Sequence, residues 1–199
     1  MIAGIILAAG ASSRMGSPKA LLEYRGESFI QRLVRVLSPV CGPVIVVLGY
    51  HAAEIRPGIP GSAVVAINPA PERGQLSSLQ TGLQALPADA EGFLFTPVDS
   101  PAVESHTVAR VADGFRRRDP ATLLVIPRIQ TPRGPKRGHP VFAARAIAEE
   151  LLALPATAMA SEVIHRHIPQ TVYVDVDDPG ILVDVDDPAA YRLITESAS

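Results

Sequence analysis

The chain has 199 residues, of which 47% are hydrophobic and 5% aromatic, and its formal net charge is −2. This composition allows a sizeable core in one domain over residues 1–199, and the lack of a basic excess argues against nucleic-acid or membrane-surface binding. The single cysteine, Cys41, excludes an internal disulfide and a cysteine metal cluster. Because the apolar runs are too short to cross a bilayer and no basic leader begins the chain, we expect a cytoplasmic protein.

Short apolar runs alternate with helical patterns along the chain. Continuous runs rich in Val and Ile are typical of strands buried on both faces, and they predict strands at residues 2–8, 43–48, 63–67, 92–96, 122–126 and 171–174. Apolar residues at helical spacing predict helices around residues 29–37, 76–86 and 108–115. This alternation predicts an α/β fold, a three-layer α/β/α sandwich around a Rossmann-like, mostly parallel sheet.

Two later segments have a different composition. Residues 127–140 are basic and rich in Pro and Gly, which predicts an irregular loop at the site or a lid. In the tail, the sequence of residues 174–179 (VDVDDP) recurs at 183–188. A turn at Pro179–Gly180 is expected to join two short extended pieces, and a final helix is expected to start near Pro188.

The strongest functional pattern is IILAAGASSRMGSPK at residues 5–19. A predicted strand ends in small residues, which let backbone N–H groups approach an anion closely, and the cations Arg14 and Lys19 follow. Ligands of open parallel sheets bind beyond the carboxyl ends of the strands. The spacing fits neither a Walker loop nor a dinucleotide fingerprint. The pattern predicts a polyphosphate site; the alternative is a Gly-rich turn with two solvated cations.

Residues 7–22, LAAGASSRMGSPKALL, resemble the signature loop of the MobA-like nucleotidyltransferases, and most closely that of the molybdenum cofactor cytidylyltransferases. The resemblance implies a fold of the nucleotide-diphospho-sugar transferase type. It also implies that the triphosphate is bound by Leu7, Ala8, Ala9, Gly10, Ser12, Arg14 and Lys19, the last two neutralising charge on the leaving pyrophosphate. Ala9 favours CTP, because guanylyl-transferring relatives typically have Gly at that place.

The run from Asn68 to Leu83 predicts, from its residues alone, a loop followed by a helix that a Ser caps. The MobA-like family carries a similar run whose start contacts the nucleotide base. The resemblance therefore adds four nucleotide-binding residues, which are Asn68, Gly74, Ser77 and Ser78.

Carboxylates at two places are candidates for binding Mg²⁺. Asp99 follows an apolar run and lies between two prolines, and spacing alone leaves it as a metal ligand or a helix cap. The resemblance to the family's P-x-D-x-P element favours the metal ligand. Six Asp residues lie within residues 175–187. There the resemblance makes Asp184 the second metal ligand, with Asp186 as the alternative and residues 175–178 as a solvated turn.

The run Gly138-His139-Pro140 resembles the family's G-H-P-x-x-F element. It implies that His139 lines the pocket for the acceptor. The basic residues just before it, Arg133, Lys136 and Arg137, either contact an anionic acceptor or form a solvated basic loop, and Arg137 is taken as the candidate acceptor-binding residue. Cytidylyltransferases usually carry a Gly-Asp and a Gly-Ala-Arg in the region that corresponds to residues 153–165, and this chain lacks both. This difference concerns the identity of the acceptor more than the nucleotide chemistry. His165 and His167 are expected on a helix surface rather than in a metal site.

Together these features predict a Mg²⁺-dependent nucleotidyltransferase with Arg14, Lys19 and Asp99 as catalytic residues. The reaction that the resemblance implies is transfer of CMP from CTP to the phosphate of molybdopterin. A sugar- or polyol-phosphate acceptor is the alternative, and a non-catalytic nucleotide-binding cofactor chaperone is an alternative of another class. The expected partners are the nucleotide and a phosphorylated acceptor, with a transient contact to a molybdoenzyme or its chaperone, and neither nucleic acid nor membrane.

Overall fold

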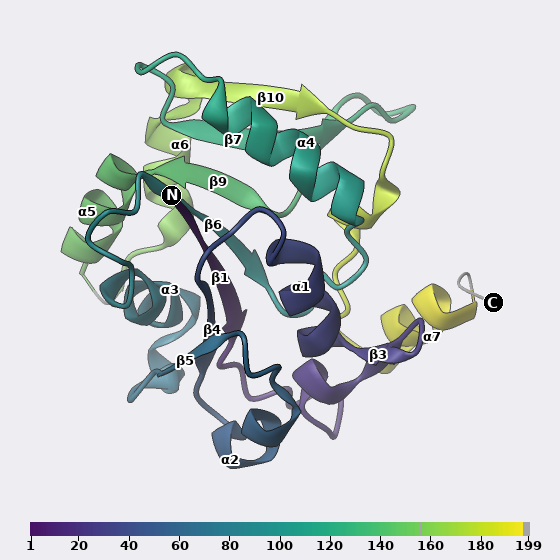
Figure 1. Cartoon of the computed structure of the whole chain (residues 1–199). Coiled ribbons are helices and arrows are strands. Elements are labelled where there is room, and N and C mark those ends of the chain that lie inside the picture. The colour runs from purple at the N-terminus through teal and green to yellow at the C-terminus, as the bar shows by residue number, and fades with distance from the viewer. Residues whose placement is uncertain (156, 197–199) are drawn as a thin grey trace.

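A computed structural model describes residues 1–155 and 157–196 of the chain (Figure 1). Residues 156 and 197–199, which the predicted domain includes, lie outside the described residues. In the described part, no helix combines the length and the apolar character that crossing a membrane requires.

The central sheet has eight strands in the order β10-β7-β9-β6-β1-β4-β5, with β8 paired to β7. Their bounds are β1 (Ile2–Ala8), β4 (Val44–Leu48), β5 (Val64–Ile67), β6 (Gly92–Pro97), β7 (Leu124–Ile129), β8 (Lys136–Arg137), β9 (Val141–Ala144) and β10 (Thr171–Asp175). β1 lies parallel to β4 and β6, β5 parallel to β4, and β10 parallel to β7. β9 runs antiparallel between β6 and β7. The six predicted strands are therefore confirmed, and the two-residue β8 and the four-residue β9 are additions to them.

Helices cover both faces of the sheet (Figure 1). On one face lie α1 (Phe29–Leu37) and α4 (Ser105–Arg116), and on the other lie α3 (Gln75–Gln84), α5 (Arg145–Ala153) and α6 (Ala160–Arg166). Strand β1 supplies both cores, because Ile6 packs in the cluster with α1 and α4 while Ile5 packs in the cluster with α3 and α5. The predicted three-layer α/β/α sandwich is confirmed.

Smaller elements lie at the edge of the sandwich. A hairpin of β2 (Glu23–Tyr24) and β3 (Glu27–Ser28) precedes α1, the short α2 (Ala52–Ile55) follows β4, and α7 (Pro188–Glu196) ends the described chain. The tyrosine hydroxyl of Tyr191 in α7 donates to the backbone oxygen of Glu23 at 2.8 Å. This bond ties the end of the chain to the hairpin (Figure 1).

The topology brings the ends of three parallel strands to one edge. β1, β4 and β6 finish at Ala8, Leu48 and Pro97, so the segments that follow them lie together. The Tyr50 N–H donates to Ala9 O, and the Val98 N–H donates to Leu7 O. A side chain at Gly49 would place its Cβ only 2.7 Å from the Cβ of Pro71. A glycine is required there so that the segments after β4 and β5 can approach.

The segment 127–140 differs from the expected irregular loop. β7 continues to Ile129, and β8 pairs back onto it in the register Arg128 with Arg137. Only a short turn remains between them, and in it Thr131 and Gly134 exchange backbone hydrogen bonds of 2.9 and 3.3 Å. The segment is a hairpin because its backbone groups find partners on the edge of β7.

The tail also differs from prediction. The first copy of the repeat ends strand β10, whereas the second copy forms no strand. Asp178, expected in a solvated turn, is buried and accepts hydrogen bonds from the Glu104 and Gly180 N–H groups. His167, expected on a helix surface, is buried after α6, where its ring contacts Glu150 and Gln170 at 2.7 Å. Both predictions of an exposed side chain were wrong for the same reason: Asp178 and His167 each form hydrogen bonds that allow a polar side chain to be buried.

Candidate functional site

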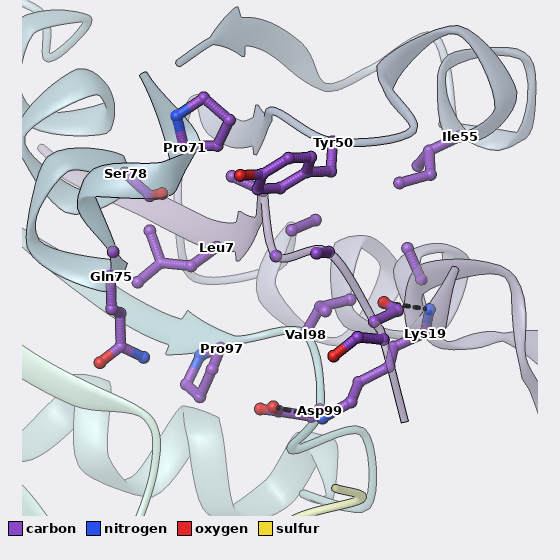
Figure 2. A pocket seen from close by; sticks show the side chains of 18 of the residues that line it. Leu7, Lys19, Tyr50, Ile55, Pro71, Gln75, Ser78, Pro97, Val98 and Asp99 are labelled. Carbon is purple, nitrogen blue, oxygen red and sulfur yellow. Dashed lines mark hydrogen bonds and ion pairs between the residues drawn. The ribbon is translucent and has the colours of Figure 1, made fainter. Parts of the chain in front are cut away.

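A cavity of about 350 Å³ opens at the edge where β1, β4 and β6 end (Figure 2). Ten of its lining residues are predicted site residues, namely Leu7, Ala8, Ala9, Gly10, Ser12, Arg14, Lys19, Gly74, Ser78 and Asp99. These residues come from three stretches that are far apart in sequence. The parallel topology assembles them, as the positions of the predicted strand ends require.

The loop after β1 forms one wall and presents free backbone donors. Across the residues that the structure describes, the N–H groups of residues 10–14 donate to no protein acceptor. The loop is held at its far end, where the Met15 N–H donates to Ser12 O at 2.9 Å and the Lys19 N–H donates to Ser12 Oγ at 3.0 Å. Consecutive free N–H groups in a fixed loop of small residues make an anion-binding surface.

Lys19 lies between two carboxylates at the rim of the cavity. Its Nζ is 3.1 Å from Asp99 Oδ2 and 2.8 Å from Asp186 Oδ1, and Figure 2 shows the Lys19 and Asp99 side chains pointing toward one another. The three side chains are 13%, 25% and 60% exposed for Lys19, Asp99 and Asp186 respectively. One ammonium therefore joins the segment after β6 to the segment before α7.

The pKa values of these groups move in directions that their surroundings explain. Burial raises the pKa of Asp99, and the attraction of Lys19 offsets this rise only in part, with Asp184 and Asp186 adding to it. Burial lowers the pKa of Lys19, but the hydrogen bonds and charges of Asp186 and Asp99 outweigh burial and leave it raised. The Lys19 hydrogen bond lowers the pKa of Asp186, with a small contribution from the charge of Arg14. Lys19 is thus firmly charged at neutral pH.

The two candidate tail carboxylates occupy different positions. Asp186 lines the cavity with Lys19, whereas Asp184 accepts a 2.8 Å hydrogen bond from Ser100 Oγ and lines a neighbouring cavity. Both carboxylates are close enough to Asp99 to raise its pKa. The structure thus brings the alternative residue, Asp186, to the cavity and leaves Asp184 beside it.

The donor set at the rim fits a magnesium ion. The described residues contain no group of three or more His, Cys, Asp or Glu side chains arranged to hold a metal. Mg²⁺ needs only one or two carboxylates in a nucleotide site, because phosphate oxygens and water complete its shell. Asp99 and Asp186, which already share one cation in Lys19, supply that pair.

The wall opposite the loop is the start of α3. Gly74 caps this helix with φ of +91°, a conformation that side chains disfavour. Gly74 and Ser78 line the cavity, but Asn68 and Ser77 do not. Asn68 is buried, and its Nδ2 donates to Ser77 Oγ at 2.9 Å and to Ser78 Oγ at 3.0 Å. The structure therefore places Asn68 and Ser77 behind the wall, where they support the residues that form it.

A second cavity of about 310 Å³ holds the predicted acceptor residues Arg137 and His139. It is lined by Ile126, Arg137, Gly138, His139, Val141, Ile164, His165, Ile181, Leu182 and Asp184. The Arg137 guanidinium donates to Tyr173 Oη at 3.1 Å. Burial lowers the pKa of His139 although Asp184 and Asp99 oppose it, so its imidazole is neutral. The cavity combines five apolar residues with the Arg137 cation, the Asp184 carboxylate and the imidazoles of His139 and His165.

Comparison with known proteins gives the family. The model of a family described as the MobA-like NTP transferase domain matches residues 4–172. The chain belongs to the MobA-like NTP transferase family. A molybdenum cofactor guanylyltransferase of Sinorhizobium fredii is 32% identical over 151 residues, which are 74% of this chain and 65% of that protein. A probable molybdenum cofactor guanylyltransferase of Bacillus cytotoxicus is 31% identical over 111 residues, 55% of each.

The chain thus spans between half and two thirds of the length of these curated relatives. Among solved structures, the crystal structure of Rv0371c from Mycobacterium tuberculosis matches 98% of this MobA-like chain and 97% of its own, at 30% identity and a TM-score of 0.81. A structure of Rv0371c with manganese matches 98% of both chains, at 27% identity and a TM-score of 0.76.

Several residues that line the cavity of this MobA-like chain were not predicted from the sequence. Among them are Tyr50, Ile55, Pro71 and Gln75, which Figure 2 labels in the cavity lining. Tyr50 could have been found, because it follows a predicted strand by two residues and strand ends form the site. Pro71 and Gln75 lie in the predicted run from Asn68 to Leu83, but the motif did not show that these two side chains face the cavity.

Proposed function

We propose that this chain is a nucleotidyltransferase that moves a nucleoside monophosphate from a nucleoside triphosphate to a phosphorylated acceptor. The observation that carries the proposal is the set of free N–H groups at residues 10–14, which share one cavity with Lys19 and Asp99. A polyphosphate needs several donors and a cation in one place, and this wall offers both. The family membership and the names of the curated relatives support the same reaction.

For this transfer the protein mainly has to position the two substrates and neutralise the charge of their phosphates. A phosphate oxygen of the acceptor attacks the α-phosphorus, a new phosphoanhydride bond forms, and the bond to the bridging oxygen breaks. Pyrophosphate leaves with the electron pair of that bond. The acceptor oxygen is already anionic, so no side chain needs to remove a proton. Arg14 and Lys19 would neutralise the charge that gathers on the leaving group.

Magnesium is the proposed metal, with Asp99 as its ligand and Asp184 or Asp186 as the second. When bound, it would screen the triphosphate and stabilise charge on the leaving pyrophosphate. The proximity of both tail carboxylates to Asp99 supports this placement. The manganese that a structure of Rv0371c contains supports a divalent cation in a related protein.

We propose CTP as the donor and the phosphate of molybdopterin as the acceptor. Ala9 lines the cavity at the place where guanylyl-transferring relatives typically have Gly, which supports CTP. The curated relatives are named guanylyltransferases, so GTP is the competitor to test. The second cavity, with Arg137 and the neutral His139, is the proposed acceptor site.

Pyrophosphate release tests the proposal. The full chain is incubated with Mg²⁺, molybdopterin and each of CTP, GTP, ATP and UTP, and pyrophosphate is measured. We expect release with CTP and a loss of at least about 100-fold in kcat/KM for Lys19→Gln, because a donor to the leaving group is removed. Lys136→Gln, which removes an exposed lysine of β8, is the matched control and should leave the rate unchanged. The proposal would be contradicted if none of the four triphosphates gave pyrophosphate release, or if the Lys19 and Lys136 variants lost activity equally.

A further inference from the structure

The ion pairs of Lys19 are unequal. Asp99 follows a core strand and is 25% exposed, whereas Asp186 is 60% exposed and lies between the 3₁₀ turn at Pro179–Leu182 and α7. An exposed ion pair contributes little to stability, so it separates at small cost. The shorter contact, at 2.8 Å, is nevertheless the one to Asp186. Lys19 thus has one partly buried partner, Asp99, and one exposed partner, Asp186, from which it can separate more easily.

The backbone holds Asp186 in place on both sides. The Val185 N–H donates to Asp99 O at 2.8 Å, and Asp187 Oδ1 accepts from the Ala189 and Ala190 N–H groups at the start of α7. The carboxylate of Asp186 is therefore presented to Lys19 by a segment that is fixed at each end. This contact is a built feature of the rim rather than a chance encounter of two long side chains.

We infer that Asp186 is a positioning residue that holds the Lys19 ammonium at the rim and competes with the triphosphate for it. This inference rests on the proposed function, because its ligand is the triphosphate. A polyphosphate on residues 10–14 would need the same ammonium, so it must draw Lys19 away from Asp186. A divalent cation that binds the carboxylates would release Lys19 toward the phosphates. Asp186 therefore makes nucleotide affinity depend on the divalent cation.

Calorimetric titration of the full chain with CTP, in EDTA and then in Mg²⁺, tests this inference. Asp186→Asn should bind CTP about three- to fivefold more tightly than the wild type in EDTA, the amount that a weak exposed ion pair represents. The gain in affinity that Mg²⁺ gives should be smaller in this variant than in the wild type.

Two controls separate competition for Lys19 from simple loss of a negative charge. Asp184→Asn removes an equal charge beside the cavity, but Asp184 bonds to Ser100 rather than to Lys19, and it should give a smaller gain in EDTA. In a Lys19→Gln background, Asp186→Asn should give no more than the Asp184→Asn gain. Circular dichroism melting verifies that each variant is folded.

The outcomes are distinct. If the wild type does not bind CTP with or without Mg²⁺, the proposal of CTP as the donor fails, and the inference, whose ligand is that triphosphate, fails with it. If the wild type binds CTP but Asp186→Asn does not tighten binding in EDTA, the inference about Asp186 is overturned while the proposed function stands. An equal gain from Asp186→Asn with and without Lys19 would also overturn it, because the effect would then be charge alone.

Discussion

Asp99 shows how a single residue of this site works against the stability of the fold. Burial raises its pKa above the ordinary value of 3.8, and Lys19 offsets this rise only in part. A carboxyl with a raised pKa binds protons more tightly in the folded chain than in the unfolded chain. Its contribution to the free energy of unfolding therefore falls as pH rises from 3.8 through the raised value. Ionisation of the buried Asp99 therefore lowers the stability of the fold, a cost that its proposed role as a metal ligand would explain.

Asp99→Asn separates these two effects. At pH 7 we expect a melting temperature equal to or above that of the wild type, because an amide avoids the cost of burying a charge. We expect pyrophosphate release to fall by at least about 100-fold, because the proposed metal ligand is lost. Thermal melting and the pyrophosphate assay check both. A variant that melts well below the wild type and loses activity only in proportion to its unfolded fraction would contradict this role.

At the scale of elements, Asn68 joins the end of β5 to the start of α3. Its Nδ2 donates to two serine hydroxyls of the helix, and its Oδ1 accepts from the Ala70 N–H at 2.9 Å. This buried amide fixes the angle at which the helix meets the cavity, so Gly74 and Ser78 depend on it. The nucleotide-binding role predicted for Asn68 stays a prediction, and its position indicates support from behind.

Asn68→Ala should therefore destabilise the fold by about 1–3 kcal/mol, since buried hydrogen-bonding groups lose their partner. CTP affinity should fall as well, because the wall of the cavity loses its support. Thr81→Ala is the control on the same helix. Among the described residues the Thr81 hydroxyl bonds only to Ser77 O, one turn earlier, so its effect should stay within about 0.5 kcal/mol. Urea unfolding of both variants measures the difference. Equal small effects would show that Asn68 does not support the helix.

The elements also show what the sequence could predict. The strands rich in Val and Ile were predicted because their side chains must be buried on both faces, and that pattern is local. β8 and the turn before it were not, because Lys136 and Arg137 form a strand only through pairing with β7. The repeat is the clearest case. The same six-residue sequence contributes the end of strand β10 at residues 174–179 but forms no strand at residues 183–188, where it passes the rim of the cavity. Pairing with β7, which only the first copy has, therefore decides whether this sequence is a strand.

The residues of the candidate site divide in the same way, into those with a local sequence signal and those that only the folded chain brings together. The loop from Leu7 to Lys19 and Asp99 could be found, since glycines, cations and a carboxylate at strand ends are local signals. Asp186 was only an alternative to Asp184, because two similar carboxylates two residues apart differ only in what the folded chain places beside them. Tyr50 and Ile55 lie outside the predicted motifs, and Pro71 and Gln75 lie within the run from Asn68 to Leu83 at positions that the motif did not single out, so packing places all four in the cavity wall.

The order of strands in the whole sheet decides which segments meet at the site. β1 lies between β4 and β6, so the N–H donors after β1, Asp99 after β6 and Tyr50 after β4 come from three neighbouring strands. Helix α3, which forms the opposite wall, follows β5, the strand beside β4. The chain then returns from the far edge of the sheet, through β10, to place Asp186 and α7 against the N-terminal loop and hairpin (Figure 1). Residues from near both ends of the described chain thus complete one cavity.

A crystal structure of the full chain with Mg²⁺ and a CTP analogue that cannot be cleaved between the α- and β-phosphates decides whether this edge of the sheet is the triphosphate site. We expect the triphosphate to lie on the N–H groups of residues 10–14, with the ammonium of Lys19 on a phosphate and Asp99 at the metal. A nucleotide bound elsewhere, or a triphosphate that leaves these N–H groups and Lys19 without contact, would contradict it.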